Sequence, residues 1–424
     1  MTEIAPISRA LSFLAPGKTI YVPGTSVESL ALIEFLKAHP QASRGVRFIS
    51  MLIPGINSFD YTSLHPEARF IAFFPLPQIR QSILSGRTEL MPHSYYGAYK
   101  HIEQHIDIDV AFVHVSPPDS SGTCNLGLAA DFSALALARA TRKVALVNQA
   151  MPVTCGDTTL PAAGFDALIN VDGPLVTTQS SPAPKSYVQV GANVATLIKD
   201  GDSLQLGLGT LQSAVLPALK DRRNLRICSG MITQAVMDLD QMGALAADEG
   251  AVTTGVAVGG PAFVDWLREN PRVHFKPVEM THGPDVGHDH HRFVAVNSAI
   301  EVDLLGQVNS EAADGRIIST SGGLTDFMRA AARHPDGCPI IALPSTSRKG
   351  TMSRIVATLA PGTPVSIPKS DPLIVVTDHG VADLRHLGLD QRAAALIAIA
   401  APPHRKRLER EWNSLRSQFF GSTL

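Results

Sequence analysis

The chain has 424 residues, of which 45% are hydrophobic and 17% are charged, and its formal net charge is −2. This length predicts two domains, and the small charged fraction excludes a disordered chain. A net charge so close to zero provides no field to attract phosphate backbones, so we expect no nucleic-acid partner. The low charge also favours a homodimer or a higher homo-oligomer that buries apolar surface.

Targeting segments and membrane spans are not predicted. The N-terminus lacks the basic and apolar stretches of a signal peptide, and the apolar run at residues 393–401 is far shorter than a spanning helix of roughly 20 residues. The four cysteines are too scattered for a metal knuckle and too few for a disulfide framework. We therefore expect a cytoplasmic protein that contacts no membrane.

Short apolar segments alternate with helix-like stretches along the first part of the chain. Residues 19–22 predict a buried strand, and apolar positions at helical spacing from Val27 to Leu36 predict a helix capped by Ser26. Further strands are predicted at residues 46–52, 110–115, 144–147 and 168–171. This alternation indicates an α/β fold with a mostly parallel sheet covered by helices.

The second part of the chain repeats this order. Five segments match in sequence: 201–210 with 17–25, 225–229 with 46–50, 299–304 with 107–110, 339–344 with 143–147, and 371–375 with 166–170. We therefore predict two tandem related α/β domains, residues 1–183 and 184–424, with a linker at residues 180–184. Because ligands bind beyond the carboxyl ends of parallel strands, we expect the active site between the two domains.

Two glycine pairs that follow predicted strands are candidate ligand loops. Gly207 and Gly209 precede a predicted helix at residues 211–220, and Gly322 and Gly323 precede another at residues 327–332. Glycines let the backbone approach a ligand closely, and a helix N-terminus stabilises an anion or an oxyanion. Each pair is equally typical of a tight turn, so the glycines alone leave both interpretations open.

The loop at residues 344–350 also follows a predicted strand and combines hydroxyl groups with two cations. Ser345, Arg348 and Lys349 suit a phosphate-bearing ligand, although a solvated polar loop has the same composition.

Histidines and one cysteine provide the remaining chemical candidates. Three histidines lie within residues 288–291, and His282 precedes them. This cluster is more typical of a polar loop than of a metal site, so we predict no bound metal. A single histidine acting as an acid, a base or a donor fits better. Cys228 and Ser229 are candidate nucleophiles, although Cys228 is more typical of a small core residue.

Motifs spread over nearly the whole chain carry a family resemblance. They are Val115–Gly122 with Leu126 and Gly127, Asn148 with Met151 and Pro152, Val296–Leu304, Gly322–Phe327, and Pro344–Thr346 with Gly350 and Thr351. Together they resemble the acetyl-CoA hydrolase/transferase family, in the branch that includes 4-hydroxybutyrate CoA-transferases. The resemblance implies two CoA-transferase-like domains of the NagB/RpiA type. It also implies acyl-CoA and a small carboxylic acid as partners, with coenzyme A as substrate and product and no permanently bound cofactor.

The same resemblance implies roles for individual residues. Gly322 and Gly323 match the family's oxyanion glycines, although Thr320 replaces a third glycine. Contacts with the substrate or with CoA are implied for Gly207, Gly209, Asn297, Ser345, Arg348 and Lys349.

The match breaks at the nucleophile. Typical members attack acyl-CoA with a glutamate carboxylate and form a glutamyl-CoA thioester. Gly230 stands at that position, and His282 stands where the family usually has an asparagine. Histidine can donate a hydrogen bond, as asparagine does, and it can also accept a proton from water.

Three functions follow from this departure. The first is thioester hydrolysis or direct acyl transfer without the glutamyl intermediate, with His282 as the base. The second is CoA transfer between an acyl-CoA and a carboxylate by a displaced acid, such as Asp238 or Glu279. The third is a CoA-binding protein that has lost catalysis. We rank them in this order.

Overall fold

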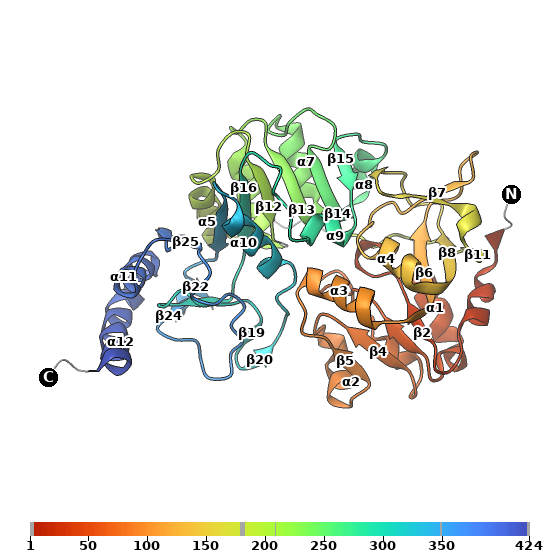
Figure 1. The fold of residues 1–424 in the computed structure, drawn as a ribbon, viewed down its shortest axis with the longest axis horizontal. Helices are drawn as coiled ribbons and strands as arrows, with labels where there is room; N and C mark the ends of the chain where they lie inside the picture. The colour runs from red at the N-terminus through yellow and green to blue at the C-terminus, as the bar shows by residue number, and fades with distance from the viewer. Residues whose placement is uncertain (1–3, 179–182, 208, 348–349, 422–424) are drawn as a thin grey trace.

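The computed structural model describes residues 4–178, 183–207, 209–347 and 350–421. Two lobes lie side by side along the longest axis of the molecule, each built on a sheet flanked by helices (Figure 1). The N-terminus lies at the outer end of the first lobe, and the last two helices lie at the opposite end of the molecule. None of the described helices is both long and apolar enough to cross a membrane.

The first sheet is parallel and has the strand order β1-β11-β8-β6-β2-β3-β4-β5. Its strands are β1 (Ile4–Ala5), β2 (Thr19–Tyr21), β3 (Arg47–Ile49), β4 (Arg69–Ala72), β5 (Thr88–Leu90), β6 (Ile108–Val115), β8 (Ala140–Val147) and β11 (Ala167–Asn170). The α-helices of this half are α1 (Leu30–Ala38), α2 (Arg80–Leu84), α3 (Tyr95–His105) and α4 (Ser133–Arg139). A separate hairpin pairs β7 (Thr123–Asn125) with β10 (Thr159–Pro161).

The second sheet has the order β26-β25-β21-β16-β12-β13-β14-β15-β9, in which only the described pair β25 and β26 is antiparallel. Its strands are β12 (Ser203–Leu206), β13 (Arg226–Thr233), β14 (Val252–Val258), β15 (Val273–Phe275), β16 (Phe293–Asn297), β21 (Cys338–Ala342), β25 (Ile374–Thr377), β26 (Gly380–Asp383) and β9 (Cys155–Gly156). The edge strand β9 comes from the first half of the chain and pairs with β15.

The α-helices of the second half are α5 (Lys185–Ala195), α6 (Thr210–Val215), α7 (Gln234–Gln241), α8 (Pro261–Leu267), α9 (Val278–His282), α10 (Leu324–Arg333), α11 (Leu389–Ile399) and α12 (Pro402–Phe420). Short strands form small additional sheets: β17 (Glu301–Asp303), β18 (Val308–Asn309) and β24 (Ile355–Val356); β19 (Ala312–Ala313) and β20 (Arg316–Ile317); β22 (Thr346–Ser347) and β23 (Met352–Ser353). The 3-10 helices are η1 (Ile7–Phe13), η2 (Thr25–Val27), η3 (Pro40–Ser43), η4 (Tyr61–Leu64), η5 (Pro77–Ile79), η6 (Ala162–Gly164) and η7 (Leu216–Leu219).

The two sheets share one strand order, which confirms the predicted internal repeat. Strands β25-β21-β16-β12-β13-β14-β15 take the places of β11-β8-β6-β2-β3-β4-β5. Four of the five predicted segment pairs fall on equivalent strands. The pairing of 299–304 with 107–110 was wrong, because the counterpart of β6 is β16, whereas residues 301–303 form β17 in a small separate sheet. The domain boundary at residue 183 stays a prediction.

The predicted start of the first helix was also wrong. Ser29, not Ser26, caps α1, because its side chain accepts a hydrogen bond from the Leu32 amide at 3.3 Å. Ser26 lies instead in the 3-10 helix η2, and its hydroxyl donates a hydrogen bond to the Leu128 carbonyl. The sequence contains two serines near the helix start, and only the backbone path decides which one caps it.

A continuous apolar core joins the two lobes. One cluster of buried side chains includes Phe48 and Phe112 of the first lobe together with Phe263 and Phe275 of the second. Burial of this kind stabilises the lobes against each other as well as each sheet against its helices. The carboxyl ends of the second sheet therefore face the first lobe across a fixed interface.

Candidate active site

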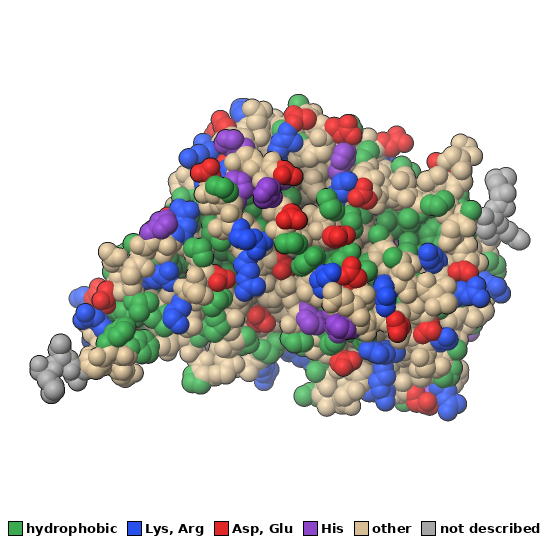
Figure 2. All heavy atoms as spheres, in the orientation of Figure 1, with side chains coloured by type: hydrophobic (Ala, Val, Ile, Leu, Met, Phe, Trp, Pro, Cys, Tyr) green, Lys and Arg blue, Asp and Glu red, His purple; other side chains and the backbone are tan. Residues whose placement is uncertain are grey.

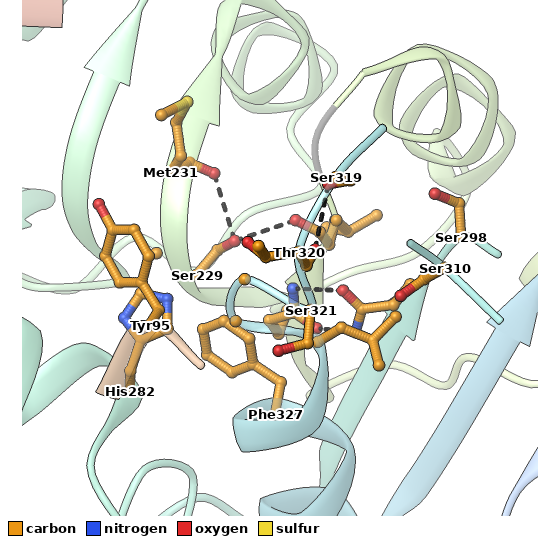
Figure 3. A pocket seen from close by; sticks show the side chains of 18 of the residues that line it. Tyr95, Ser229, Met231, His282, Ser298, Ser310, Ser319, Thr320, Ser321 and Phe327 are labelled. Atoms are coloured by element: carbon orange, nitrogen blue, oxygen red, sulfur yellow. Dashed lines mark hydrogen bonds between the residues drawn. The ribbon is translucent and has the colours of Figure 1, made fainter. Parts of the chain in front are cut away.

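A cavity of about 220 Å³ lies where the strand ends of the second sheet meet the first lobe (Figure 3). Residues at or near the ends of β12, β13 and β16 form one wall. The first lobe contributes Ile53, Phe74 and Tyr95. The other lining residues are Gln205, Leu206, Gly207, Ser229, Gly230, Met231, His282, Asn297, Ser298, Ser310, Ser319, Thr320, Ser321, Gly322, Gly323, Leu324 and Phe327. The cavity lies between the lobes, where the sequence predicted the active site.

The imidazole of His282 lies directly against the Cα atom of Gly230. A Cβ atom built on Gly230 would overlap Cε1 of the ring and lie 2.5 Å from Nε2. A Cβ on Gly323 would lie 2.8 Å from the same Nε2 atom. Real Cβ atoms do not tolerate such contacts, so both glycines are required by the position of the ring. His282 thus fills the space that any side chain at position 230 would enter.

Two aromatic rings hold His282 from opposite lobes. Its ring centroid lies 4.5 Å from that of Tyr95 on α3 and 4.6 Å from that of Phe327 on α10. The side chain is buried, and burial lowers the pKa of His282 to about 3. The ring is therefore neutral at physiological pH, because the apolar surroundings disfavour the charged form.

The hydrogen bonds of the neighbouring Thr281 determine which ring nitrogen carries the proton. Its Oγ1 lies 3.3 Å from the Pro277 carbonyl oxygen and 3.0 Å from Nδ1 of His282. A hydroxyl has one proton, so both contacts are hydrogen bonds only if Thr281 donates to Pro277 and the ring Nδ1–H donates to Thr281. This arrangement leaves the lone pair on Nε2, the nitrogen that faces Gly230 and Gly323.

The loop that contains Gly322 and Gly323 is bound to the first lobe by hydrogen bonds. The Thr320 hydroxyl donates to the Phe73 carbonyl at 2.9 Å, and the Tyr95 amide donates to the Gly322 carbonyl at 2.9 Å. Threonine at position 320 thus provides a bond that the glycine of the family pattern could not form. The loop leads into α10, whose N-terminus is directed towards the cavity beside His282 (Figure 3).

Asp326, in the first turn of α10, completes this connection. Its carboxylate accepts hydrogen bonds from the Ser94 hydroxyl at 2.8 Å and from the Tyr96 amide at 3.0 Å. Burial raises the pKa of Asp326 to about 6. These bonds hold the N-terminus of α3, and therefore Tyr95, against the glycine loop.

The first glycine loop lies at the edge of the cavity. Gly207 lines it, and a Cβ there would lie 3.0 Å from Oδ1 of Asn297. Asn297 and Gln205 form a reciprocal amide pair, with hydrogen bonds of 2.7 and 3.3 Å. Gly209 does not line the cavity; its φ of 88° is in the left-handed region, which favours glycine at the start of α6. The backbone conformation of the turn is therefore sufficient to explain a glycine at position 209. Contact with a ligand stays a prediction for Gly207.

Two of the remaining sequence candidates, Ser345 and Cys228, do not line the cavity. Ser345 is fully buried, does not line the cavity, and its backbone amide donates to Asp378 at 2.6 Å. Arg348 and Lys349 lie outside the described residues, so their contacts stay predictions. Cys228 is a core residue, and burial raises the pKa of its thiol to about 12. Ser229 lines the cavity, but its hydroxyl donates to backbone carbonyls.

The histidine cluster does not join the site. His288 and His291 are exposed, and His290 contacts the Ser203 hydroxyl at 2.9 Å. Among the described residues, no three His, Cys, Asp or Glu side chains are placed to hold a metal ion.

Several cavity residues were missed from the sequence. Tyr95, Phe74 and Ser321 belong to none of the family motifs, and Ser298 and Phe327 lie within such motifs but were not singled out as site residues. Ile53 and Phe74 follow predicted or observed strands of the first lobe, so the rule that ligands bind beyond strand ends could have found them if it had been applied to both halves.

We predict that Gly230→Ala destabilises the protein by about 1–3 kcal/mol, because the added methyl group overlaps the His282 ring. In a His282→Asn background the same change will cost less, giving a coupling of about 1 kcal/mol or more in a double-mutant cycle by urea unfolding. Gly255→Ala is the matched control. It lies on the adjacent strand, and its Cβ would lie 3.2 Å from the Gly230 carbonyl oxygen and 3.5 Å from Asp131 Cβ and Thr281 Oγ1, without contact with the ring. Equal costs of Gly230→Ala in both backgrounds would contradict the contact.

A second prediction concerns pH. His282 has a folded pKa of about 3 and an ordinary value of 6.5, so the unfolded chain binds more protons between these values. The free energy of unfolding will therefore fall as the pH is lowered from about 6.5 towards 3. His282→Asn will show a shallower slope over this range. Chemical denaturation at a series of pH values measures both slopes; identical slopes would show that the ring is not buried as described.

Comparison with known proteins agrees with this geometry. Residues 4–180 match the acetyl-CoA hydrolase/transferase N-terminal domain, and residues 259–412 match the C-terminal domain of the same family. The chain is 33% identical over 393 residues to the 4-hydroxybutyrate coenzyme A transferase of Clostridium kluyveri, covering 91% of each protein.

Solved structures match over nearly the whole length. The crystal structure of RipA from Yersinia pestis has a TM-score of 0.90 at 27% identity and 98% coverage of both chains. A 4-hydroxybutyrate CoA-transferase from Porphyromonas gingivalis has a TM-score of 0.80 at 29% identity and 97% coverage of both. The chain therefore belongs to the acetyl-CoA hydrolase/transferase family and is an enzyme of that class.

Proposed function

We propose that the protein opens an acyl-CoA thioester without a glutamyl-CoA intermediate, by hydrolysis or by direct acyl transfer to another acceptor. The observation that carries the proposal is the position of His282, whose ring fills the space in front of Gly230. None of the described residues that line the cavity is an aspartate or a glutamate. A carboxylate nucleophile thus has neither a side chain at position 230 nor room beside it.

In this proposal the neutral imidazole acts as a general base. Nε2 of His282 accepts a proton from a water molecule as the water oxygen attacks the thioester carbonyl carbon. When the tetrahedral intermediate collapses, the C–S bond breaks and the imidazolium returns the proton to the sulfur of CoA. The products are the free acid and the CoA thiol. In direct acyl transfer, a hydroxyl or an amine takes the place of water.

Two features of the site support this chemistry. The oxyanion of the intermediate would lie near Gly322 and Gly323, where the N-terminus of α10 provides amide groups and the positive end of a helix dipole. The imidazolium would form between the rings of Tyr95 and Phe327, whose centroids at 4.5 and 4.6 Å are close enough to stabilise a cation.

The second candidate is CoA transfer, which the names of the relatives favour. It needs a carboxylate, and the two displaced acids lie elsewhere. Glu279 is exposed and accepts a hydrogen bond from the Tyr99 hydroxyl at 3.3 Å. Asp238 accepts one from the Gln234 amide at 3.2 Å. Neither lines the cavity. The third candidate is a CoA-binding protein without catalysis. We also propose that the protein is oligomeric and cytoplasmic. Arg348 and Lys349 are proposed to contact CoA.

The proposal predicts that the protein releases free thiol from acyl-CoA and that borohydride treatment during turnover leaves no modified glutamate in peptide mass spectra. His282→Gln removes the base and will lower thiol release by about 100-fold. A CoA adduct on any glutamate, or CoA exchange with a free carboxylate by ping-pong kinetics, would support the transferase instead. Binding of CoA without thiol release would support the third candidate.

A gain of function tests the role of the ring from the other direction. Gly230→Glu combined with His282→Asn restores a carboxylate and the space for it, so this double variant will form a glutamyl-CoA adduct with acyl-CoA. Gly230→Glu alone, where the imidazole still occupies the space, will not form the adduct. Adduct formation by the single variant would show that the ring does not exclude a side chain at position 230.

A further inference from the structure

The charge of the cavity limits which acyl groups it can hold. Resting on the proposed function, in which the cavity holds an acyl-CoA thioester, we propose that it takes a short, uncharged acyl group and rejects one that ends in a second carboxylate.

The wall carries no charged side chain. Among its twenty described residues there is no Asp, Glu, Lys or Arg. Its two titratable rings are neutral at physiological pH: burial lowers the pKa of His282 to about 3 and raises the pKa of Tyr95 well above its ordinary value. The wall therefore offers no cation to a carboxylate on the acyl chain.

Two acids among the described residues lie behind the wall. Asp131, buried at 3% exposure, accepts a hydrogen bond from the Tyr95 hydroxyl at 3.2 Å. Asp326 lies one residue before Phe327 on α10 and is bound to Ser94 and Tyr96. Burial raises the pKa of each of these acids to about 6, so both are mostly ionised at pH 7. A carboxylate in the cavity would lose its hydration and would also be repelled by these two groups.

The remaining surface suits a neutral group of a few carbons. The volume of about 220 Å³ is below the roughly 300–1,000 Å³ of pockets for drug-sized ligands. The apolar residues Ile53, Phe74 and Met231 line the cavity together with hydroxyl residues such as Ser298 and Ser310. These two serines lie on the side opposite to Tyr95 and His282 (Figure 3). The outer surface in Figure 2 mixes acidic and basic side chains, so the neutrality is a property of the cavity and not of the whole molecule.

Butyryl-CoA and succinyl-CoA provide the direct test, because their acyl groups have the same chain length and differ in the terminal carboxylate. We expect kcat/KM for thiol release to be at least about 100-fold higher with butyryl-CoA, since burying a carboxylate without a cationic partner costs far more than burying a methyl group. The CoA thioester of succinate monomethyl ester, which is neutral, will be cleaved more readily than succinyl-CoA. Titration calorimetry with the same three thioesters measures the preference in binding alone.

A variant with an added cation makes the test specific to charge. Ser298 is exposed at the cavity, so Ser298→Lys can place an ammonium group there. This variant will reduce the preference for butyryl-CoA by about tenfold or more, whereas Ser298→Met, of similar length but neutral, will keep it. Unchanged preference in Ser298→Lys would count against the charge argument.

The outcomes separate this inference from the proposed function. A glutamyl adduct would overturn the proposed mechanism. The preference for an uncharged acyl group would then be tested by the binding data alone. Equal binding of succinyl-CoA and butyryl-CoA would overturn the inference whatever the mechanism, and an Arg348→Ala/Lys349→Ala variant would then show whether those cations provide the charge. Failure of all three thioesters to bind would overturn both.

Discussion

The contact between the His282 ring and the bare Cα atom of Gly230 is the constraint on which the chemistry of this site depends. The ring can lie there only because Gly230 and Gly323 have no Cβ atom. In return the ring removes the space for a nucleophilic side chain at position 230. Each of these residues is compatible only with the other's size, so Gly230 and His282 form one structural unit. In the proposed function, this unit provides a base in place of a carboxylate nucleophile.

The position of the ring is decided by both lobes together. Tyr95 comes from the first lobe and Phe327 from the second, and the imidazole lies between them. The bonds from Thr320 to Phe73 and from Ser94 to Asp326 keep these two walls at a constant separation. A site assembled across an interface in this way loses its geometry if either wall moves, so interface stability and catalysis are linked. The same assembly shields the ring from bulk solvent, and this burial is the reason for its low pKa.

Electrostatics give the site a second property that the individual residues do not suggest. The cavity wall is neutral, while Asp131 and Asp326 lie immediately behind it and hold Tyr95 and α3 in place. These acids therefore act structurally, and in the proposed selectivity they also disfavour an anionic acyl group without a repulsive residue in the wall itself. The proposed substrate class follows from the buried interface rather than from a recognition motif.

The departure from the family pattern at positions 230 and 282 stays a prediction. The sequence alone was sufficient for the α/β class, the internal repeat and the family, which the structure and the comparisons confirm. These features are local or periodic. Strand and helix spacing, glycine pairs and short motifs can be recognised in the sequence without knowledge of long-range contacts. It failed where long-range packing decides, as in the assignment of residues 299–304 to a central strand and of the first helix cap to Ser26. Only the tertiary structure showed that the Gly230 space is filled by His282, that Tyr95 and Phe327 enclose the ring, and that the wall is neutral. Those facts depend on contacts between residues up to about two hundred positions apart, and such contacts are set by how the two lobes pack and not by any local pattern.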